Sequence, residues 1–197
     1  MRIIAGTLKG RRLVAPRGDV TRPTADQVRI ALMDTLMPYL PGARVLDLFA
    51  GAGGVGLEAL SRGAAHATFV ERDARAVAAL RRNVDTLGVA AAARVARGDV
   101  HRALASLARA GERFDIVFLD PPYESGALGA AVAALGEGRV TAPGALVIAQ
   151  HRTKQPPLST AGALAAFRTR RFGETTLTFF RAGGYDRTSP SGPSDAQ

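Results

Sequence analysis

Short apolar runs alternate with helical stretches along the middle of the chain. The runs expected to form strands cover residues 44–48, 67–70, 94–96, 114–119 and 145–149. Segments expected to form helices lie between them, near residues 54–62, 74–87, 100–110 and 127–136. Strands this apolar are typical of a parallel sheet that is buried on both faces. The alternation therefore predicts a doubly wound α/β fold.

The two ends of the chain have other patterns. Residues 2–6 and 10–16 flank a glycine-containing turn, which predicts a small basic hairpin. Thr24 followed by Gln27 has the spacing of a capping box, so a helix is expected to begin there, with an apolar stripe that docks on the main body. Residues 167–172 and 175–181 flank Gly173 and Glu174, which predicts a closing antiparallel hairpin.

A length of 197 residues suits one domain with a small appendage. We expect a basic N-terminal hairpin extension over residues 1–23, a main domain over 24–185 and a disordered tail over 186–197. No apolar run approaches a membrane span of about 18 residues. Met1 is not followed by a secretory leader, so a cytoplasmic location is expected. The chain has no Cys and only three widely spaced His, so neither disulfides nor a metal site are expected.

Positive charge is concentrated at the two ends. The formal net charge is +9, of which residues 1–23 carry +5, residues 24–150 carry 0 and residues 151–185 carry +5. A genome's base composition can explain why Arg outnumbers Lys, but it does not explain why Asp and Glu are scarce at the two ends. Basic flanks favour a polyanionic partner, because neutralising phosphates releases counterions. The candidate RNA-binding residues are Arg11, Arg12, Arg22, Arg29, Arg170 and Arg171.

A glycine cluster follows the first buried strand. Gly51, Gly53 and Gly56 have the G-x-G-x-x-G spacing that allows a tight turn and a close approach of ligand to backbone. Glu71 ends the second strand twenty residues after Gly51, where a carboxylate would bind a ribose diol. The pattern predicts a nucleoside-containing cofactor and leaves open a dinucleotide, as in a nicotinamide dehydrogenase.

Acidic residues near this turn separate the cofactor classes. Asp47 is expected at the rim of the sheet, where its charge would repel a pyrophosphate and suit a sulfonium or ammonium group. This favours S-adenosylmethionine, with S-adenosylhomocysteine as product. Asp99 is expected to accept from an adenine amino group or to cap the next helix, and the two roles are compatible. The candidate cofactor-binding residues are Asp47, Phe49, Gly51, Ala52, Gly53, Glu71, Arg72, Asp99, Val100 and Asp120.

The strand over residues 114–119 runs directly into Asp120, Pro121, Pro122 and Tyr123. The prolines restrict the backbone, so the turn is rigid. We expect the Asp120 carboxylate and the Pro121 carbonyl to accept both hydrogens of an exocyclic amine, whose lone pair then points at a methyl donor. Tyr123 would stack on the base. These four are the candidate catalytic residues.

The sequence resembles the RsmD-type methyltransferases, which are amino-methyltransferases that use S-adenosylmethionine. The likeness rests on Asp-Pro-Pro-Tyr at 120–123 and on residues 22–29, 47–53, 57–64 and 172–175. It implies a Rossmann-like class I methyltransferase fold with a seven-stranded, mostly parallel sheet whose last strand is antiparallel. It also implies methylation of the 2-amino group of a guanine in 16S ribosomal RNA, without a metal. The chain departs from the family at Ile30 and Gln150, where a Glu is usual.

Two alternatives stay open. A DNA or RNA adenine amino-methyltransferase would have the same cluster, although the chain lacks a separate domain to read a duplex. A non-catalytic RNA-binding assembly module that retains affinity for the cofactor belongs to a different class. The expected partner is 16S ribosomal RNA within a small-subunit assembly intermediate, and the expected state is a monomer.

Overall fold

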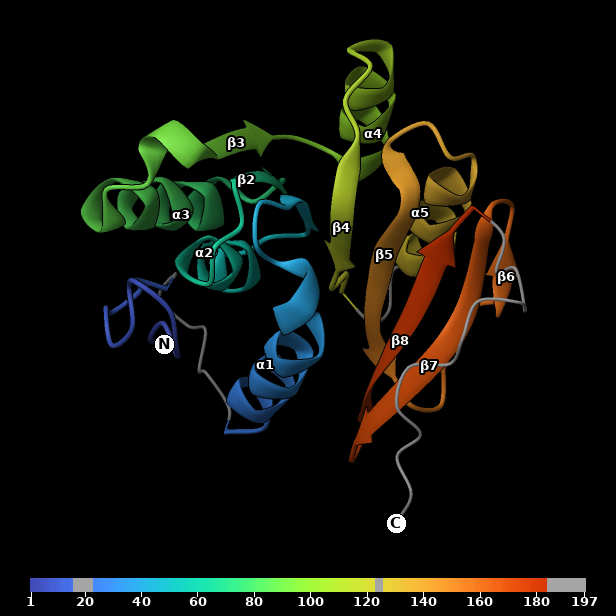
Figure 1. Cartoon of the computed structure of the whole chain (residues 1–197), viewed down its shortest axis with the longest axis horizontal. Coiled ribbons are helices and arrows are strands. Elements are labelled where there is room, and N and C mark those ends of the chain that lie inside the picture. Colours follow the sequence, from blue (N-terminus) through green and yellow to red (C-terminus); the bar gives the residue numbers. More distant parts are fainter. Residues whose placement is uncertain (16–22, 123–125, 184–197) are drawn as a thin grey trace.

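The structure is a computed structural model that describes residues 1–15, 23–122 and 126–183. A single sheet with helices on both faces forms its centre (Figure 1). The strands are β1 (Arg44–Leu48), β2 (His66–Glu71), β3 (Ala93–Arg97), β4 (Phe114–Leu119), β5 (Thr141–Arg152), β6 (Thr160–Ala161), β7 (Leu164–Phe172) and β8 (Thr175–Ala182). The α-helices are α1 (Pro23–Leu36), α2 (Gly54–Ser61), α3 (Ala74–Leu87), α4 (Val100–Arg109) and α5 (Ala127–Gly136), and two short 3-10 helices cover Met37–Tyr39 and Ala90–Ala92.

The strand order is β3-β2-β1-β4-β5-β8-β7-β6. The first five strands are parallel to one another, and β8 lies antiparallel between β5 and β7. This confirms the predicted fold class, a mostly parallel α/β sheet with an antiparallel closing pair. The described sheet has eight strands where the resemblance implies seven, because the two-residue β6 pairs with the start of β7.

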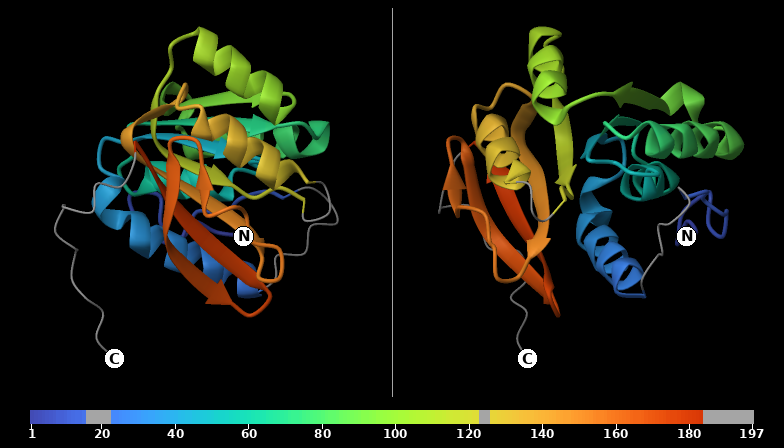
Figure 2. Two further views of the ribbon diagram at one scale, coloured as in Figure 1. Left: turned by 90° about the vertical axis from the view of Figure 1, so that its right-hand side faces the viewer. Right: turned by 180° about the vertical axis from the view of Figure 1, so that it is seen from behind.

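Each central strand buries both of its faces. Val45 and Ile116 pack with α1, α2 and α3, whereas the adjacent Leu46 and Val117 pack with α4 and α5. Figure 2 shows these two helical layers on opposite sides of the twisted sheet. Burial on both faces explains why the strands read as continuous apolar runs. Among the described residues, no helix is both long and apolar enough to cross a bilayer.

The N-terminal segment, residues 1–15, lies beside α2 and α3 (Figure 1). Within it the backbone forms one antiparallel bridge, between Arg2 and Arg12, so the predicted hairpin is a bridged loop without regular strands. The reason is that its backbone bonds to α2: the N–H groups of Ile4 and Ala5 donate to the Glu58 carboxylate at 2.7 and 2.9 Å. The predicted tail over residues 186–197 lies outside the described residues, and the predicted domain bounds stay predictions.

The carboxyl ends of β1, β2 and β4 meet at one edge of the sheet. Leu48 of β1 pairs with Val70 of β2 and with Leu119 of β4. The residues that follow these positions are therefore neighbours, among them Glu71 and Asp120. Doubly wound sheets bind their ligands at this edge.

Candidate active site

The turn between β1 and α2 keeps its outer side open. Gly51 has a φ of +55°, and a Cβ there would meet no other atom within 4 Å. A Cβ at Gly56 would instead overlap the ring of Phe69 in β2. The first glycine therefore leaves room for a ligand, and the second lets α2 pack closely on the sheet. Phe49 has a φ of 63°, and it is the one non-glycine residue with a positive φ in the described ranges. Backbone strain of this kind clusters at functional sites.

Ala52 and Gly53, both predicted to bind cofactor, face the protein interior. The Ala52 carbonyl accepts a hydrogen bond from Asn83 Nδ2 at 3.0 Å, and a Cβ at Gly53 would overlap the Leu80 side chain. Asn83 also bonds both backbone groups of Val14, at 2.7 and 2.9 Å. Sequence reasoning missed Asn83, although a polar residue three positions after Leu80 on the apolar face of α3 was a usable signal. These residues shape the turn from behind.

Asp47 lies beneath the turn and not at the rim, which corrects the prediction. Its side chain is 2% exposed, and Oδ2 accepts from the Gly56 N–H at 3.0 Å. Asp47 shares the strand face of Val45, which α2 covers, so its carboxyl points inward. Burial raises the pKa of Asp47 to about 7, and the charges of Asp120 and Glu71 add to this, while the Gly56 bond acts in the opposite direction. Asp47 therefore holds the start of α2 in place.

Two other acids lie at the open side. Glu71 Oε2 accepts from the Gly51 N–H at 2.8 Å, and Oε1 accepts from the Asp73 N–H at 2.8 Å. A carboxylate has about four acceptor sites, so each oxygen can still accept from a hydroxyl. Asp99 caps α4 as expected: its Oδ1 accepts from the amides of His101 and Arg102 at 3.0 and 3.2 Å. The cap uses one carboxylate oxygen and leaves the other for a ligand.

A pocket of about 430 Å³, open to solvent, joins these acids to the proline corner after β4. Six predicted site residues line it: Phe49, Glu71, Arg72, Asp99, Val100 and Pro122. Sequence reasoning missed the rest of the lining, which is Val70, Gly98, His101 and Ala127. Of these, His101 carried a signal, because it follows the capping Asp99 by two positions.

Asp120 and Pro121 form the corner beside this pocket. Pro121 is buried and Asp120 is partly buried. Burial raises the pKa of Asp120 to about 7, and its charge contributes to the raised pKa of Asp47. The corner and the glycine turn therefore belong to one site. Tyr123, the last residue of the predicted cluster, lies outside the described residues. Among those described, no group of three or more acidic or histidine side chains is arranged to hold a metal.

Of the predicted RNA-binding arginines, three have exposed side chains: Arg11, Arg12 and Arg171. Arg11 also donates to the Thr86 carbonyl at 2.7 Å, which fixes it beside the end of α3. Arg22 lies outside the described residues.

The structure changes the interpretation of Arg29, and it gives Arg170 a contact within the protein. Arg170 donates from Nη1 to Ala31 O and to Thr35 Oγ1 at 3.1 and 3.0 Å, so it ties β7 to α1. Arg29 is 6% exposed and pairs with Asp26 at 3.0 Å. Arg29 is therefore buried within the protein, whereas Arg170 is half-buried and its contact with RNA stays a prediction.

Relatives of known sequence and structure cover almost the whole chain. The family model "Conserved hypothetical protein 95" matches residues 1–181. Ribosomal RNA small subunit methyltransferase D of Haemophilus influenzae is 35% identical over 156 residues, which is 79% of this chain and 81% of the relative. The chain belongs to the RsmD-type methyltransferases.

Two further comparisons agree with membership of the RsmD-type family. YlbH of Bacillus subtilis, described as a candidate rRNA methyltransferase, is 39% identical over 184 residues, 93% of this chain and 100% of the relative. The structure of yhhF from Escherichia coli, described as a candidate methyltransferase, has a TM-score of 0.80 at 34% identity, over 94% of this chain and 99% of that one. The predicted resemblance and the class I methyltransferase fold are confirmed.

Proposed function

We propose that this RsmD-type enzyme methylates the exocyclic 2-amino group of a guanine in 16S ribosomal RNA. The observation that carries the proposal is the place of the Asp-Pro-Pro corner. Pro122 lines the same pocket as Glu71 and Asp99, and Asp120 lies beside it. S-adenosylmethionine, when bound, supplies an electrophilic methyl group attached to a sulfonium. Its cationic centre suits a pocket edged by carboxyl groups.

Different pocket residues bind different parts of the cofactor. Glu71 retains acceptor sites for the ribose hydroxyls, and Asp99 Oδ2 for the adenine amino group. Phe49, Val100 and Pro122 supply apolar wall to an aromatic base. Gly51 has no side chain, and the space that a Cβ would enter is open, so the ligand can approach the backbone of the turn. Asp47 acts as a positioning residue through its bond to the α2 backbone.

Asp120 and the Pro121 carbonyl orient the target amine. An aromatic amine is a weak nucleophile, because its lone pair is delocalised into the ring. Accepting both N–H hydrogens favours a pyramidal nitrogen and directs its lone pair, so the rate gain comes from orientation and electrostatics. The nitrogen loses one proton after it gains the methyl group. The Asp120 carboxylate, whose pKa is raised by burial to about 7, is suited to take that proton.

The remaining assignments follow from charge and position. Exposed Arg11, Arg12 and Arg171 bind phosphates of the RNA, and Tyr123 stacks on the flipped base. We propose that the enzyme acts in the cytoplasm as a monomer on a small-subunit assembly intermediate.

Transfer of a labelled methyl group from S-adenosylmethionine tests the proposal. The purified enzyme should label 16S RNA or an immature small subunit and should leave duplex DNA unlabelled. Asp120→Ala should lose this activity. Asp115→Ala is the matched control: Asp115 lies on β4, the strand that Asp120 follows, but it is exposed and accepts from the Arg44 N–H at 2.8 Å at the opposite edge of the sheet. Labelling of adenine, or of duplex DNA alone, would contradict the assignment.

A further inference from the structure

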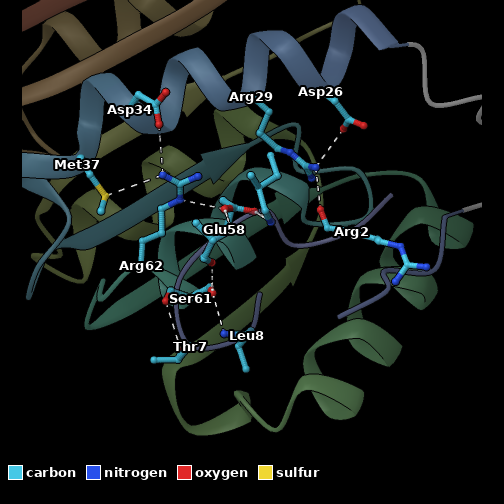
Figure 3. A network of polar contacts seen from close by, with 12 residues as sticks. Arg2, Thr7, Leu8, Asp26, Arg29, Asp34, Met37, Glu58, Ser61 and Arg62 are labelled. Carbon is cyan, nitrogen blue, oxygen red and sulfur yellow. Dashed lines mark hydrogen bonds and ion pairs between the residues drawn. The ribbon is translucent and has the colours of Figure 1, made fainter. Parts of the chain in front are cut away.

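Arg29 of α1 is buried with much of its guanidinium unpaired. Its exposed fraction is 6%. Nη2 donates to the Arg2 carbonyl at 2.8 Å and to Asp26 Oδ1 at 3.0 Å, as Figure 3 shows. Among the described residues, Nε and Nη1 have no hydrogen-bond partner. Buried polar groups are nearly always paired. A cationic group with unused donors, held inside the protein, points to an anionic ligand.

The unpaired side of Arg29 lies at the start of α2. Nη1 is 3.4 Å from the position that a Cβ at Gly54 would occupy. Gly54 is the first residue of α2 and directly follows the glycine turn. The first amides of a helix lack intrahelical acceptors and attract anions. The Gly56 amide donates to Asp47. The amides of Gly54 and Val55 have no acceptor within the described ranges.

The charges around the turn are complementary to an amino acid. Asp47, Glu71 and Asp120 make the sheet side of the turn acidic, and the charges of Glu71 and Asp120 both act on Asp47. Arg29 brings a positive charge to the α1 side of the same turn. A ligand that spans the turn is therefore cationic on one side and anionic on the other. The methionyl part of S-adenosylmethionine has this form, since its sulfonium and ammonium are cationic and its carboxylate is anionic.

We propose that Arg29 binds the carboxylate of the cofactor's amino-acid group, together with the first amides of α2. The inference rests on the proposed function, because it takes S-adenosylmethionine as the ligand of this pocket. It gives Arg29 a role in binding the cofactor in place of the RNA contact predicted from the sequence. The guanidinium lies between α1, α2 and the N-terminal segment (Figure 3), beside the first residue of α2, so the cofactor turn is its neighbour.

Two ligands that differ in this group provide the test. S-adenosylhomocysteine has the carboxylate, and 5′-methylthioadenosine lacks the whole amino-acid part. We expect Arg29→Met to weaken S-adenosylhomocysteine binding 10- to 100-fold and to change 5′-methylthioadenosine binding less than twofold, as measured by titration calorimetry. The wild-type preference for S-adenosylhomocysteine should therefore shrink by the same factor.

Arg62→Met is the matched control. Arg62 is also a buried arginine of this layer, with a side chain 4% exposed, but it pairs with Glu58 at 2.9 Å and with Asp34 at 3.6 Å (Figure 3). Its loss should alter stability and leave the preference between the two ligands unchanged. If circular dichroism shows that Arg29→Met does not fold, Arg29→Lys replaces it in the test. Lys keeps the positive charge but lacks the planar guanidinium with its paired N–H donors. It should still weaken S-adenosylhomocysteine binding selectively.

An equal loss for both ligands in the Arg29 variant would overturn the inference, because a merely structural role predicts that result. So would an unchanged affinity for S-adenosylhomocysteine. A wild-type protein that binds neither compound would overturn the proposed function as well, so the two failures can be told apart.

Discussion

Replacing Asp120 by Asn should stabilise the protein while abolishing its activity. Burial raises the pKa of Asp120 from 3.8 to about 7, so ionising it in the folded protein costs about 4 kcal/mol more than in the unfolded chain. The folded state binds the proton more tightly, so the wild-type free energy of unfolding falls as pH rises from about 4 to about 7. Asn carries no charge at any of these pH values. The stability advantage of Asp120→Asn should therefore grow by about 2 to 3 kcal/mol between about pH 5 and about pH 8.

Methyl transfer should change in the opposite direction. Removing one preorganised group from a site typically lowers the rate on the order of 100-fold or more. In the wild type, kcat/KM for RNA should rise with pH and level off above about 7, since the carboxylate is the form that accepts from the amine. Urea unfolding at several pH values, together with labelled methyl transfer, measures both effects.

Asp115→Asn is the control for this comparison. Asp115 is exposed near the start of β4, the strand that Asp120 follows, and its carboxylate accepts from the Arg44 N–H. Its substitution should give no stability gain that grows with pH and no loss of activity. If Asp120→Asn showed a difference from wild type that stayed constant from about pH 5 to about pH 8, Asp120 would not be a desolvated carboxyl, and this explanation of its chemistry would be wrong.

Three further substitutions test separate parts of the structure. Glu58 is fully buried and accepts from Ile4, Ala5 and Arg62, so Glu58→Ala should lower the free energy of unfolding in urea by about 3 to 5 kcal/mol. A loss below about 1 kcal/mol would contradict the conclusion that Glu58 holds the N-terminal segment on α2. Gly56→Ala should cost about 1 to 3 kcal/mol through its overlap with Phe69. Gly51→Ala should cost about 1 kcal/mol through its positive φ and should in addition weaken S-adenosylhomocysteine binding; a Gly51→Ala protein with unchanged affinity for this compound would refute the distinction. Replacing Arg11 and Arg12 by Gln should weaken RNA binding and make the slope of log K against log salt concentration shallower by roughly 1 to 2, without changing S-adenosylhomocysteine affinity. A matching loss in cofactor binding would argue against a role for these arginines in RNA binding alone.

The core of the fold could be predicted because its signals are local. The bounds of β1, β4, α3 and α5 agree with the predicted ranges 44–48, 114–119, 74–87 and 127–136. Apolar patterning predicts these elements directly. The carboxyl ends of parallel strands meet at one edge of the sheet, which brings the residues after β1, β2, β3 and β4 together. The predicted neighbourhood of Glu71, Asp99 and Pro122 in one pocket follows from that rule alone.

The parts that were missed depend on contacts between distant residues. The N-terminal segment forms no strands because its amides bond to Glu58, more than fifty positions away. Arg29 is a charged residue that local patterning places on the surface, and only the packing of α1 on α2 and the N-terminal segment shows that it is buried. Strand β6 has two residues and is held by its partner β7, so it carries no periodic signal of its own.

The role of Asp120 in guanine methylation is tested most directly by nucleoside mass spectrometry of small-subunit RNA from cells that lack this gene. We expect these cells to lack one 2-methylguanosine, which the wild-type gene restores and the Asp120→Ala gene does not. Loss of a methyladenosine, or full restoration by Asp120→Ala, would contradict the claim that this acidic corner directs a guanine amine to the methyl donor.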